Sequence, residues 1–127
     1  MTIKSSKSLV EEALKDVNTI TPNEALKLFN ENKCNLIDIR DAIELQREGR
    51  IENSFHISRG LLEFAVHPDS PYAKKEKLDP NKELVLFCAA GGRSALAAKT
   101  LKEMGFEKVS HIEGGFTAMK NSGFKTS

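Results

Sequence analysis

The segment that most constrains the fold of this chain spans residues 84–94, Leu-Val-Leu-Phe-Cys-Ala-Ala-Gly-Gly-Arg-Ser. Four apolar residues form a run typical of a buried strand, Cys88 ends the run, and two glycines follow. A helical pattern rich in alanine and leucine begins directly behind Arg93. A strand, a short glycine-bearing loop and a helix aim backbone N–H groups at the point where the helix begins, and the helix dipole adds positive charge there. This order therefore predicts a cradle for an anion.

Cys88 is expected at the centre of this cradle. Backbone N–H groups and the helix dipole favour a thiolate over a thiol, and the thiolate is the nucleophilic form of cysteine. The pattern therefore predicts a nucleophilic cysteine that acts on, or carries, anionic groups. The alternative is a buried structural cysteine in front of an ordinary helix, because free cysteine is among the most buried residue types.

Strand-like and helix-like segments alternate along the rest of the chain. Ser8 with Glu11, and Thr21 with Glu24, have the spacing of capping boxes that begin helices. Strands alternating with helices indicate an α/β fold, with a central mainly parallel sheet of about five strands and helices on both faces. The expected strands are residues 18–20 (an edge strand), 36–38, 55–57, 84–87 and 109–112; residues 41–47 and 116–121 are expected to be short helices, and residues 65–82 to be mostly loop.

Several polar residues follow the predicted strands. Ligands of open α/β sheets bind beyond the C-terminal ends of the strands, so these residues should lie at one edge. We expect structural roles for Asp38 and Arg40, because a buried carboxylate needs partners, which backbone N–H groups or an arginine would supply. Arg93 is expected to turn partly inward and lock its loop, with Glu113 as its partner. Arg59 is a candidate lip residue that could contact substrate.

Residues 88–94 resemble the signature of the rhodanese family of sulfurtransferases, cysteine-x-x-glycine-x-arginine-serine. Further segments resemble the family in the same order, over roughly residues 18–124. The resemblance implies a rhodanese-like domain at residues 18–127 behind a helical extension at residues 1–17. The segments are Asp38-Ile39-Arg40, residues 49–57 with a glycine and a later histidine-isoleucine, residues 59–64, and Glu113-Gly114-Gly115-Phe116.

The resemblance implies a sulfurtransferase that moves sulfane sulfur from a donor such as thiosulfate or a persulfide to a thiophilic acceptor. The acceptor would be a thiol, cyanide or an acceptor protein. Cys88 would carry the sulfur as a persulfide. By the same resemblance, Ala89, Ala90, Gly91, Gly92, Arg93, Ser94 and Arg59 would bind substrate, and Asp38, Arg40 and Glu113 would support the site.

Two departures from the family bear on the donor. The two-domain thiosulfate enzymes of the family have basic residues where this chain has Ala90 and Glu44. Two cations that would help to hold a doubly charged donor are therefore missing, and thiosulfate is expected to be a poor donor.

Two other functions stay open: a sulfur-carrying, sensing or protein-interaction module without turnover, and a phosphatase or arsenate reductase of related fold. Cysteine phosphatases have one more residue between cysteine and arginine.

Composition excludes several partners. The 127 residues suit one domain, and the 19 basic and 18 acidic residues include no basic block, so nucleic acid is not expected. No apolar run approaches the roughly 20 residues that cross a bilayer. The N-terminal sequence does not resemble a secretory signal, and a chain with two cysteines and a required free thiolate is expected in the cytoplasm.

The remaining candidate ligands do not cluster in the sequence. His56, His67 and His111 lie far apart, without cysteine or carboxylate at ligand spacing, so neither a metal site nor a cofactor is expected. No histidine is adjacent to Cys88, and His56 and His111 are expected to be satisfied by hydrogen bonds. Cys34 is expected to be a small, semi-buried side chain.

Overall fold

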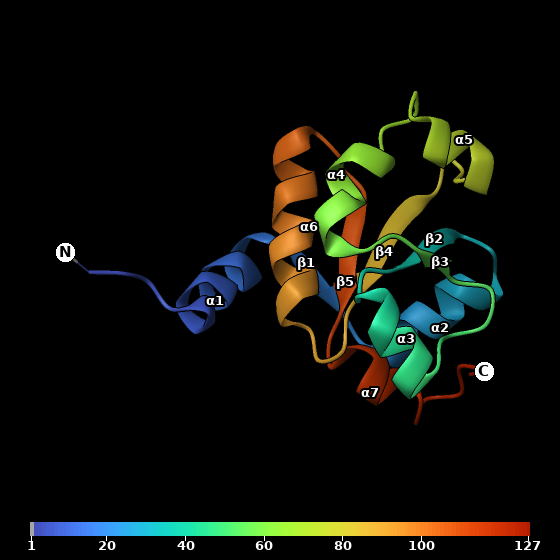
Figure 1. Ribbon diagram of the computed structural model, residues 1–127, viewed down its shortest axis with the longest axis horizontal. Helices are drawn as coiled ribbons and strands as arrows, with labels where there is room; N and C mark the ends of the chain where they lie inside the picture. The colour runs from blue at the N-terminus through green and yellow to red at the C-terminus, as the bar shows by residue number, and fades with distance from the viewer. Residues whose placement is uncertain (1) are drawn as a thin grey trace.

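The computed structural model describes residues 2–127 and has a five-stranded sheet at its centre (Figure 1). The strands are β1 (Asn18–Ile20), β2 (Cys34–Asp38), β3 (Phe55–His56), β4 (Glu83–Phe87) and β5 (Val109–Ile112). Their order in the sheet is β1-β5-β4-β2-β3, and each neighbouring pair is parallel. The predicted parallel α/β fold is therefore confirmed, with the first strand at an edge.

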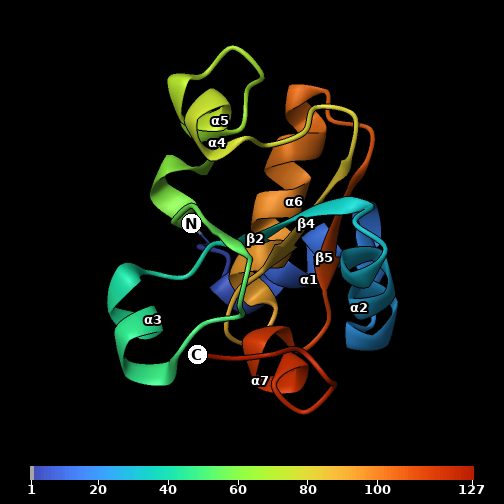
Figure 2. The ribbon, with the colours of Figure 1, turned by 90° about the vertical axis from the view of Figure 1, so that its right-hand side faces the viewer.

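Helices cover both faces of this sheet. They are α1 (Ser6–Asp16), α2 (Pro22–Asn30), α3 (Ala42–Glu48), α4 (Leu62–Ala65) behind the short 3-10 helix η1 (Arg59–Leu61), α5 (Pro71–Glu76), α6 (Gly92–Met104) and α7 (Gly115–Met119). α2 lies across the sheet from α4 (Figure 2). The alternation of side chains along β4 explains the two layers: Leu84 and Leu86 pack with α4 and α6, whereas Val85 and Phe87 pack with α2 and α7.

The helix starts differ in part from those expected. Thr21 and Glu24 form the predicted capping box of α2. The box predicted for Ser8 and Glu11 is wrong, because Ser5 caps α1 and its Oγ accepts a hydrogen bond from the Ser8 N–H at 3.0 Å. Ser8 therefore lies inside the first turn, where its own N–H needs a cap.

The region expected to be mostly loop, residues 65–82, contains α5. Ser70 caps this helix and Pro71 occupies its first turn, where the missing N–H of proline costs nothing. Proline was therefore a helix start here and not a sign of loop. In residues 2–127, no helix has the length and apolar character needed to cross a membrane.

The expected N-terminal extension at residues 1–17 contains α1; residue 1 lies outside the described residues. α1 packs against α6, with Ala13 fully buried. A Cβ atom built at Gly92 would lie 3.6 Å from Cγ2 of Val10. The extension therefore contacts the first turn of α6, directly behind the cysteine.

Candidate functional site: a cysteine loop at the end of the sheet

Cys88 directly follows β4 and is 1% exposed. The Gly91 N–H donates a hydrogen bond to its Sγ at 3.1 Å, and the Ser94 N–H donates a second at 3.4 Å. Both groups belong to the N-terminal turn of α6, whose dipole also favours negative charge. The other loop residues named from the sequence, Ala89, Ala90 and Gly92, make no hydrogen bond to Sγ in the part of the chain that the structure describes. Two backbone N–H groups therefore point at Sγ, an arrangement that can stabilise negative charge on a sulfur atom.

The shape of the loop depends on a glycine at its turn. Gly91 has φ +113°, a conformation that other L-residues rarely adopt, and it caps α6. This conformation directs the Gly91 N–H toward Sγ. The glycine in the sequence motif is therefore a requirement of the backbone.

The segment that begins with Glu113, Gly114 and Gly115 leads into α7, whose backbone binds the cysteine loop. The Phe116 N–H donates to the carbonyl oxygen of Cys88 at 2.8 Å, and the Thr117 N–H donates to that of Ala89 at 3.2 Å. A Cβ atom at Gly115 would collide with the Cys88 carbonyl oxygen and would lie 2.8 Å from the Ala89 carbonyl carbon. Only glycine lets α7 approach the cysteine loop this closely.

Arg93 pairs with Glu44 of α3, and the expected pairing with Glu113 is wrong. Its Nη1 and Nη2 donate hydrogen bonds to the two Glu44 carboxylate oxygens at 2.8 and 2.9 Å. Glu113 is exposed, and its backbone N–H donates a hydrogen bond to the Ile20 carbonyl oxygen of the edge strand β1 at 2.9 Å. The hydrogen bond from Arg93 lowers the pKa of Glu44 to about 2. The hydrogen bond from Glu44 in turn raises the pKa of Arg93, and Cys88 adds a smaller Coulombic contribution in the same direction.

Asp38 and Arg40 form a buried ion pair, with exposed fractions of 0% and 1%. Arg40 donates to Asp38 through its backbone N–H, Nε and Nη2, at 2.7 to 3.2 Å. The partners expected for the buried carboxylate are thus confirmed. The Arg40 guanidinium also lies 4.0 Å from the centre of the Phe116 ring. This pair joins the end of β2 to α7, which in turn supports the cysteine loop.

Arg59 lies beside α6 and away from its first turn. Its Nη1 donates to Glu63 at 2.7 Å, and its Nη2 donates to Thr100 Oγ1 at 3.4 Å. Thr100 is six residues beyond Ser94, or about 9 Å along the helix axis. The structure therefore ties this guanidinium to two protein side chains, and its contact with substrate stays a prediction.

His111 lies close to the cysteine loop, a position that was not predicted. Its Nδ1 lies 2.9 Å from Ser94 Oγ, which in turn lies 3.5 Å from Cys88 Sγ. The expectation that hydrogen bonds satisfy this histidine is confirmed, but no link to Cys88 was predicted. The register of the assembled sheet reveals this link: Leu86 pairs with His111, so Cys88, two residues on, lies on the same face of the sheet.

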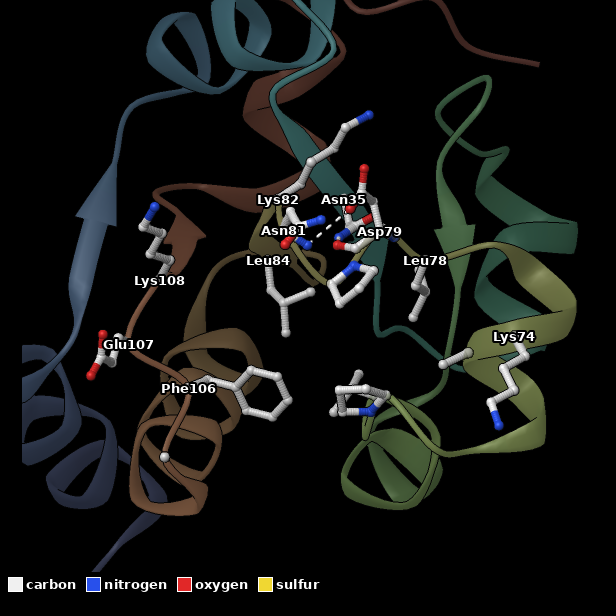
Figure 3. Close-up of a pocket in the computed structure, with 15 residues that line it drawn as sticks. Asn35, Lys74, Leu78, Asp79, Asn81, Lys82, Leu84, Phe106, Glu107 and Lys108 are labelled. Atoms are coloured by element: carbon white, nitrogen blue, oxygen red, sulfur yellow. Dashed lines mark hydrogen bonds between the residues drawn. The ribbon is translucent and has the colours of Figure 1, made fainter.

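A cavity of about 610 Å³ lies away from Cys88, at the opposite end of the sheet, where Leu84 begins the buried part of β4 and Phe106 follows α6. Figure 3 shows Leu84 and Phe106 pointing into it, whereas Lys82 and Lys108 point away. Lys82 Nζ instead bonds to Asn32 Oδ1 at 3.0 Å. The cavity is therefore separate from the cysteine loop.

Fold and site together define a small parallel α/β protein whose central strand ends in a buried cysteine, followed by a loop that ends in arginine. The model of the rhodanese-like domain family matches residues 21–122, and the chain belongs to this family.

Relatives agree with this assignment. "Putative sulfurtransferase YtwF" of Bacillus subtilis (strain 168) is 36% identical over 105 residues, which cover 83% of this chain and 89% of that protein. The solution structure of the 30 kDa polysulfide-sulfur transferase homodimer of Wolinella succinogenes is 39% identical, with a TM-score of 0.74 over 95% of this chain and 85% of that one. A Rhodopseudomonas palustris protein of unknown function, described as a possible tyrosine phosphatase, is 42% identical, with a TM-score of 0.86 over 100% of this chain and 98% of that one.

Proposed function

We propose that this protein is a sulfurtransferase that carries sulfane sulfur as a Cys88 persulfide. The observation that carries the proposal is the pair of N–H groups, from Gly91 and Ser94, that point at the buried Sγ. Fixed N–H dipoles in a buried site stabilise a sulfur anion without reorganisation. Membership of the rhodanese-like family and its sulfurtransferase relatives support the same chemistry.

The proposed reaction has two displacement steps. The Cys88 thiolate attacks the outer sulfur of the donor, an S–S bond forms to Sγ, and the bond between that sulfur and the rest of the donor breaks with its electron pair leaving on the donor remnant. A thiophilic acceptor, a thiol or cyanide, then attacks the outer sulfur, and Cys88 leaves as thiolate. Two half-reactions through one covalent intermediate predict ping-pong kinetics.

The charges around the loop bear on which donor this site prefers. Glu44 neutralises Arg93, and Ala90 adds no charge at the second position after the cysteine. A doubly charged donor such as thiosulfate therefore meets little uncompensated positive side-chain charge. Persulfides, whose outer sulfur carries at most one negative charge, are the donors we propose.

The remaining assignments belong to the same proposal. Residues 18–127 would form the catalytic unit, and α1 an extension that packs on α6. The donor or the acceptor, which could be a small thiol or a protein, would contact Arg59, Arg93 and the loop residues Ala89, Ala90 and Gly92. Asp38, Arg40 and Glu113 would support the site. Both cysteines are free, which suits the cytoplasm, the compartment that we propose.

The test loads sulfur onto the reduced protein and follows intact mass. Glutathione persulfide, polysulfide, a thiosulfonate and thiosulfate are supplied separately, and addition of one sulfur atom that is lost on adding cyanide or a thiol supports the relay. Cys88→Ser should abolish loading, while Cys34→Ser should load normally. If no donor adds sulfur to Cys88, the proposal is overturned.

The same experiment separates the competing functions. Stable loading without release to any acceptor would favour a carrier or sensing module. Cys88-dependent hydrolysis of p-nitrophenyl phosphate, together with no sulfur loading, would favour a phosphatase.

A further inference from the structure

A chain of hydrogen bonds leads from Cys88 to the outer edge of the sheet. Ser94 Oγ lies 3.5 Å from Cys88 Sγ and 2.9 Å from Nδ1 of His111. His111 Nε2 lies 2.9 Å from Oγ1 of Thr19. His111 is 1% exposed, whereas Thr19 is an exposed residue of the edge strand β1. The chain therefore connects a buried sulfur to solvent through two hydroxyl groups and one imidazole.

The number of protons in this chain allows two directions of donation. A neutral imidazole has one N–H and one acceptor nitrogen, and each hydroxyl can donate once. The Gly91 carbonyl oxygen, 3.2 Å from Ser94 Oγ, competes for the Ser94 proton. In the first direction, the Cys88 thiol donates to Ser94, Ser94 donates to Nδ1 of His111, and Nε2 donates to Thr19. In the second, Thr19 donates to Nε2, Nδ1 donates to Ser94, and the Ser94 hydroxyl donates to a thiolate at Cys88. Only the second direction gives the thiolate a hydrogen bond from a side chain.

We propose that His111, acting through Ser94, positions and relays the proton of Cys88, and that Thr19 is the exit of this path to solvent. This inference rests on the proposed sulfurtransferase function, because it concerns how the nucleophile of that reaction is prepared. His111 is a positioning residue here, since it touches neither Sγ nor the substrate. The path would matter most when a donor or acceptor fills the mouth of the loop and blocks direct access of water to the sulfur.

The proton transfer balances without a further reactant. The S–H bond of Cys88 breaks and its proton goes to Ser94 Oγ, whose own proton goes to Nδ1 of His111. The proton on Nε2 goes to Thr19 Oγ1, and the original Thr19 proton goes to water. One proton has left Cys88 and one has entered solvent, and His111 is again neutral with the other nitrogen protonated. The chain then stands in its second direction, with the Ser94 hydroxyl aimed at the thiolate.

The surroundings of His111 favour a neutral imidazole that can pass a proton on. Burial lowers the pKa of His111. Within residues 2–127, the ring of His111 has two hydrogen-bond partners, the hydroxyl groups of Ser94 on α6 and Thr19 on β1. Its neighbour on β4 is the apolar Leu86. The titratable group that this hydrogen-bond chain connects to His111 is therefore Cys88, through Ser94. Arg93 is the cation near Cys88, and Glu44 holds it.

The test measures alkylation of Cys88 by iodoacetamide as a function of pH, in a Cys34→Ser background. His111→Asn keeps a polar group near Ser94 but cannot relay a proton. We expect its alkylation rate at neutral pH to fall about tenfold and its pH profile to move to higher pH. Without the Nδ1–H donor, the Ser94 hydroxyl can turn to the Gly91 carbonyl oxygen, 3.2 Å away, which weakens its charge-assisted hydrogen bond to the thiolate. Ser110→Ala, on the same strand, is the matched control and should alkylate as the wild type does.

Thr19 provides the second, fold-preserving test, because it is exposed. Thr19→Val is isosteric and removes the hydroxyl, and Thr19→Ser restores it. We expect Thr19→Val to slow alkylation at neutral pH several-fold and Thr19→Ser to recover most of the rate. A folded His111→Asn protein with an unchanged pH profile of alkylation would overturn the role of His111. Equal alkylation rates for Thr19→Val and Thr19→Ser would overturn the role of Thr19 as the end of the path to solvent. Alkylation involves no sulfur donor, so these results stand apart from the loading experiment: normal loading with unchanged alkylation refutes the relay alone.

Discussion

Glu44 accepts two hydrogen bonds from Arg93, at 2.8 and 2.9 Å, across 49 residues of sequence. The pair fastens α3 to the first turn of α6, next to Cys88. The Glu44 carboxylate also balances the charge of Arg93, the arginine of the cysteine loop. Arg93 therefore shapes the loop while its charge is largely balanced, which separates the structural role of this arginine from attraction of anionic donors.

The first prediction concerns the stability of the Glu44 pair. The pKa of Glu44 is about 2 in the folded protein, below the roughly 4.3 of an unperturbed glutamate, so folding favours the ionised form. Its contribution is fully present above about pH 4.3 and is lost as the pH falls toward 2. Because Arg93 is 39% exposed, solvent screening limits the contribution to about 1 kcal/mol.

Glu44→Gln measures this contribution. The free energy of unfolding of the variant should fall below that of the wild type by about 1 kcal/mol at pH 7, and the difference should vanish near pH 2. Urea unfolding at several pH values checks it. A difference that stays constant from pH 7 to pH 2 would contradict the ionic origin.

The buried pair of Asp38 and Arg40 should matter more for stability. Asp38→Asn leaves the Arg40 charge buried with a neutral partner, and breaking a buried pair commonly costs about 3–5 kcal/mol. We expect a large drop in the unfolding midpoint at pH 7. A loss below 1 kcal/mol would show that Arg40 is held by its contact with Phe116 and by Gly49 instead, whose carbonyl oxygen accepts a hydrogen bond from Nη2.

Gly115 should be the glycine least tolerant of substitution. Its φ is +53°, and a Cβ atom would meet the backbone of Cys88 and Ala89. Gly115→Ala should cost at least about 1–3 kcal/mol and displace the loop, so sulfur loading of Cys88 should fall as well. Gly60→Ala is the control, because nothing lies within 4 Å of a Cβ there. Equal effects of the two substitutions would show that α7 does not hold the loop.

The two cysteines should differ sharply in reactivity. Burial raises the pKa of Cys34 to about 11, with Glu83 adding to the effect, so about one molecule in a thousand would be thiolate at pH 8. The reduced protein should therefore take one alkyl group from iodoacetamide at this pH, at Cys88. Peptide mapping checks the site, and fast modification of Cys34 would contradict the expected burial.

How far the sequence predicted this site depends on the range of the interactions. The N–H groups that point at Cys88 follow from the order strand, loop, helix, all within eleven residues, and Asp38 and Arg40 are two residues apart. The partner of Arg93 could not be found this way, because it depends on where α3 lies against α6. The link to His111 depends on the register of β4 and β5, which only the assembled sheet fixes.

The last prediction concerns charge and donor choice. Ala90→Lys adds a cation at the loop, and Glu44→Gln removes the carboxylate that balances Arg93, so each should raise the rate with thiosulfate and leave an uncharged donor almost unaffected. An exposed ionic contact is worth about 0.2–1 kcal/mol, so each gain should be at most roughly fivefold. Added salt should reduce both gains, because solvent ions screen charges at the open mouth of the loop. Asn81→Lys, an exposed change at the opposite end of β4, is the control for net charge alone. If neither substitution changes thiosulfate kinetics at low ionic strength in a folded protein, the electrostatic explanation is wrong, and the shape of the loop or a partner protein must select the donor.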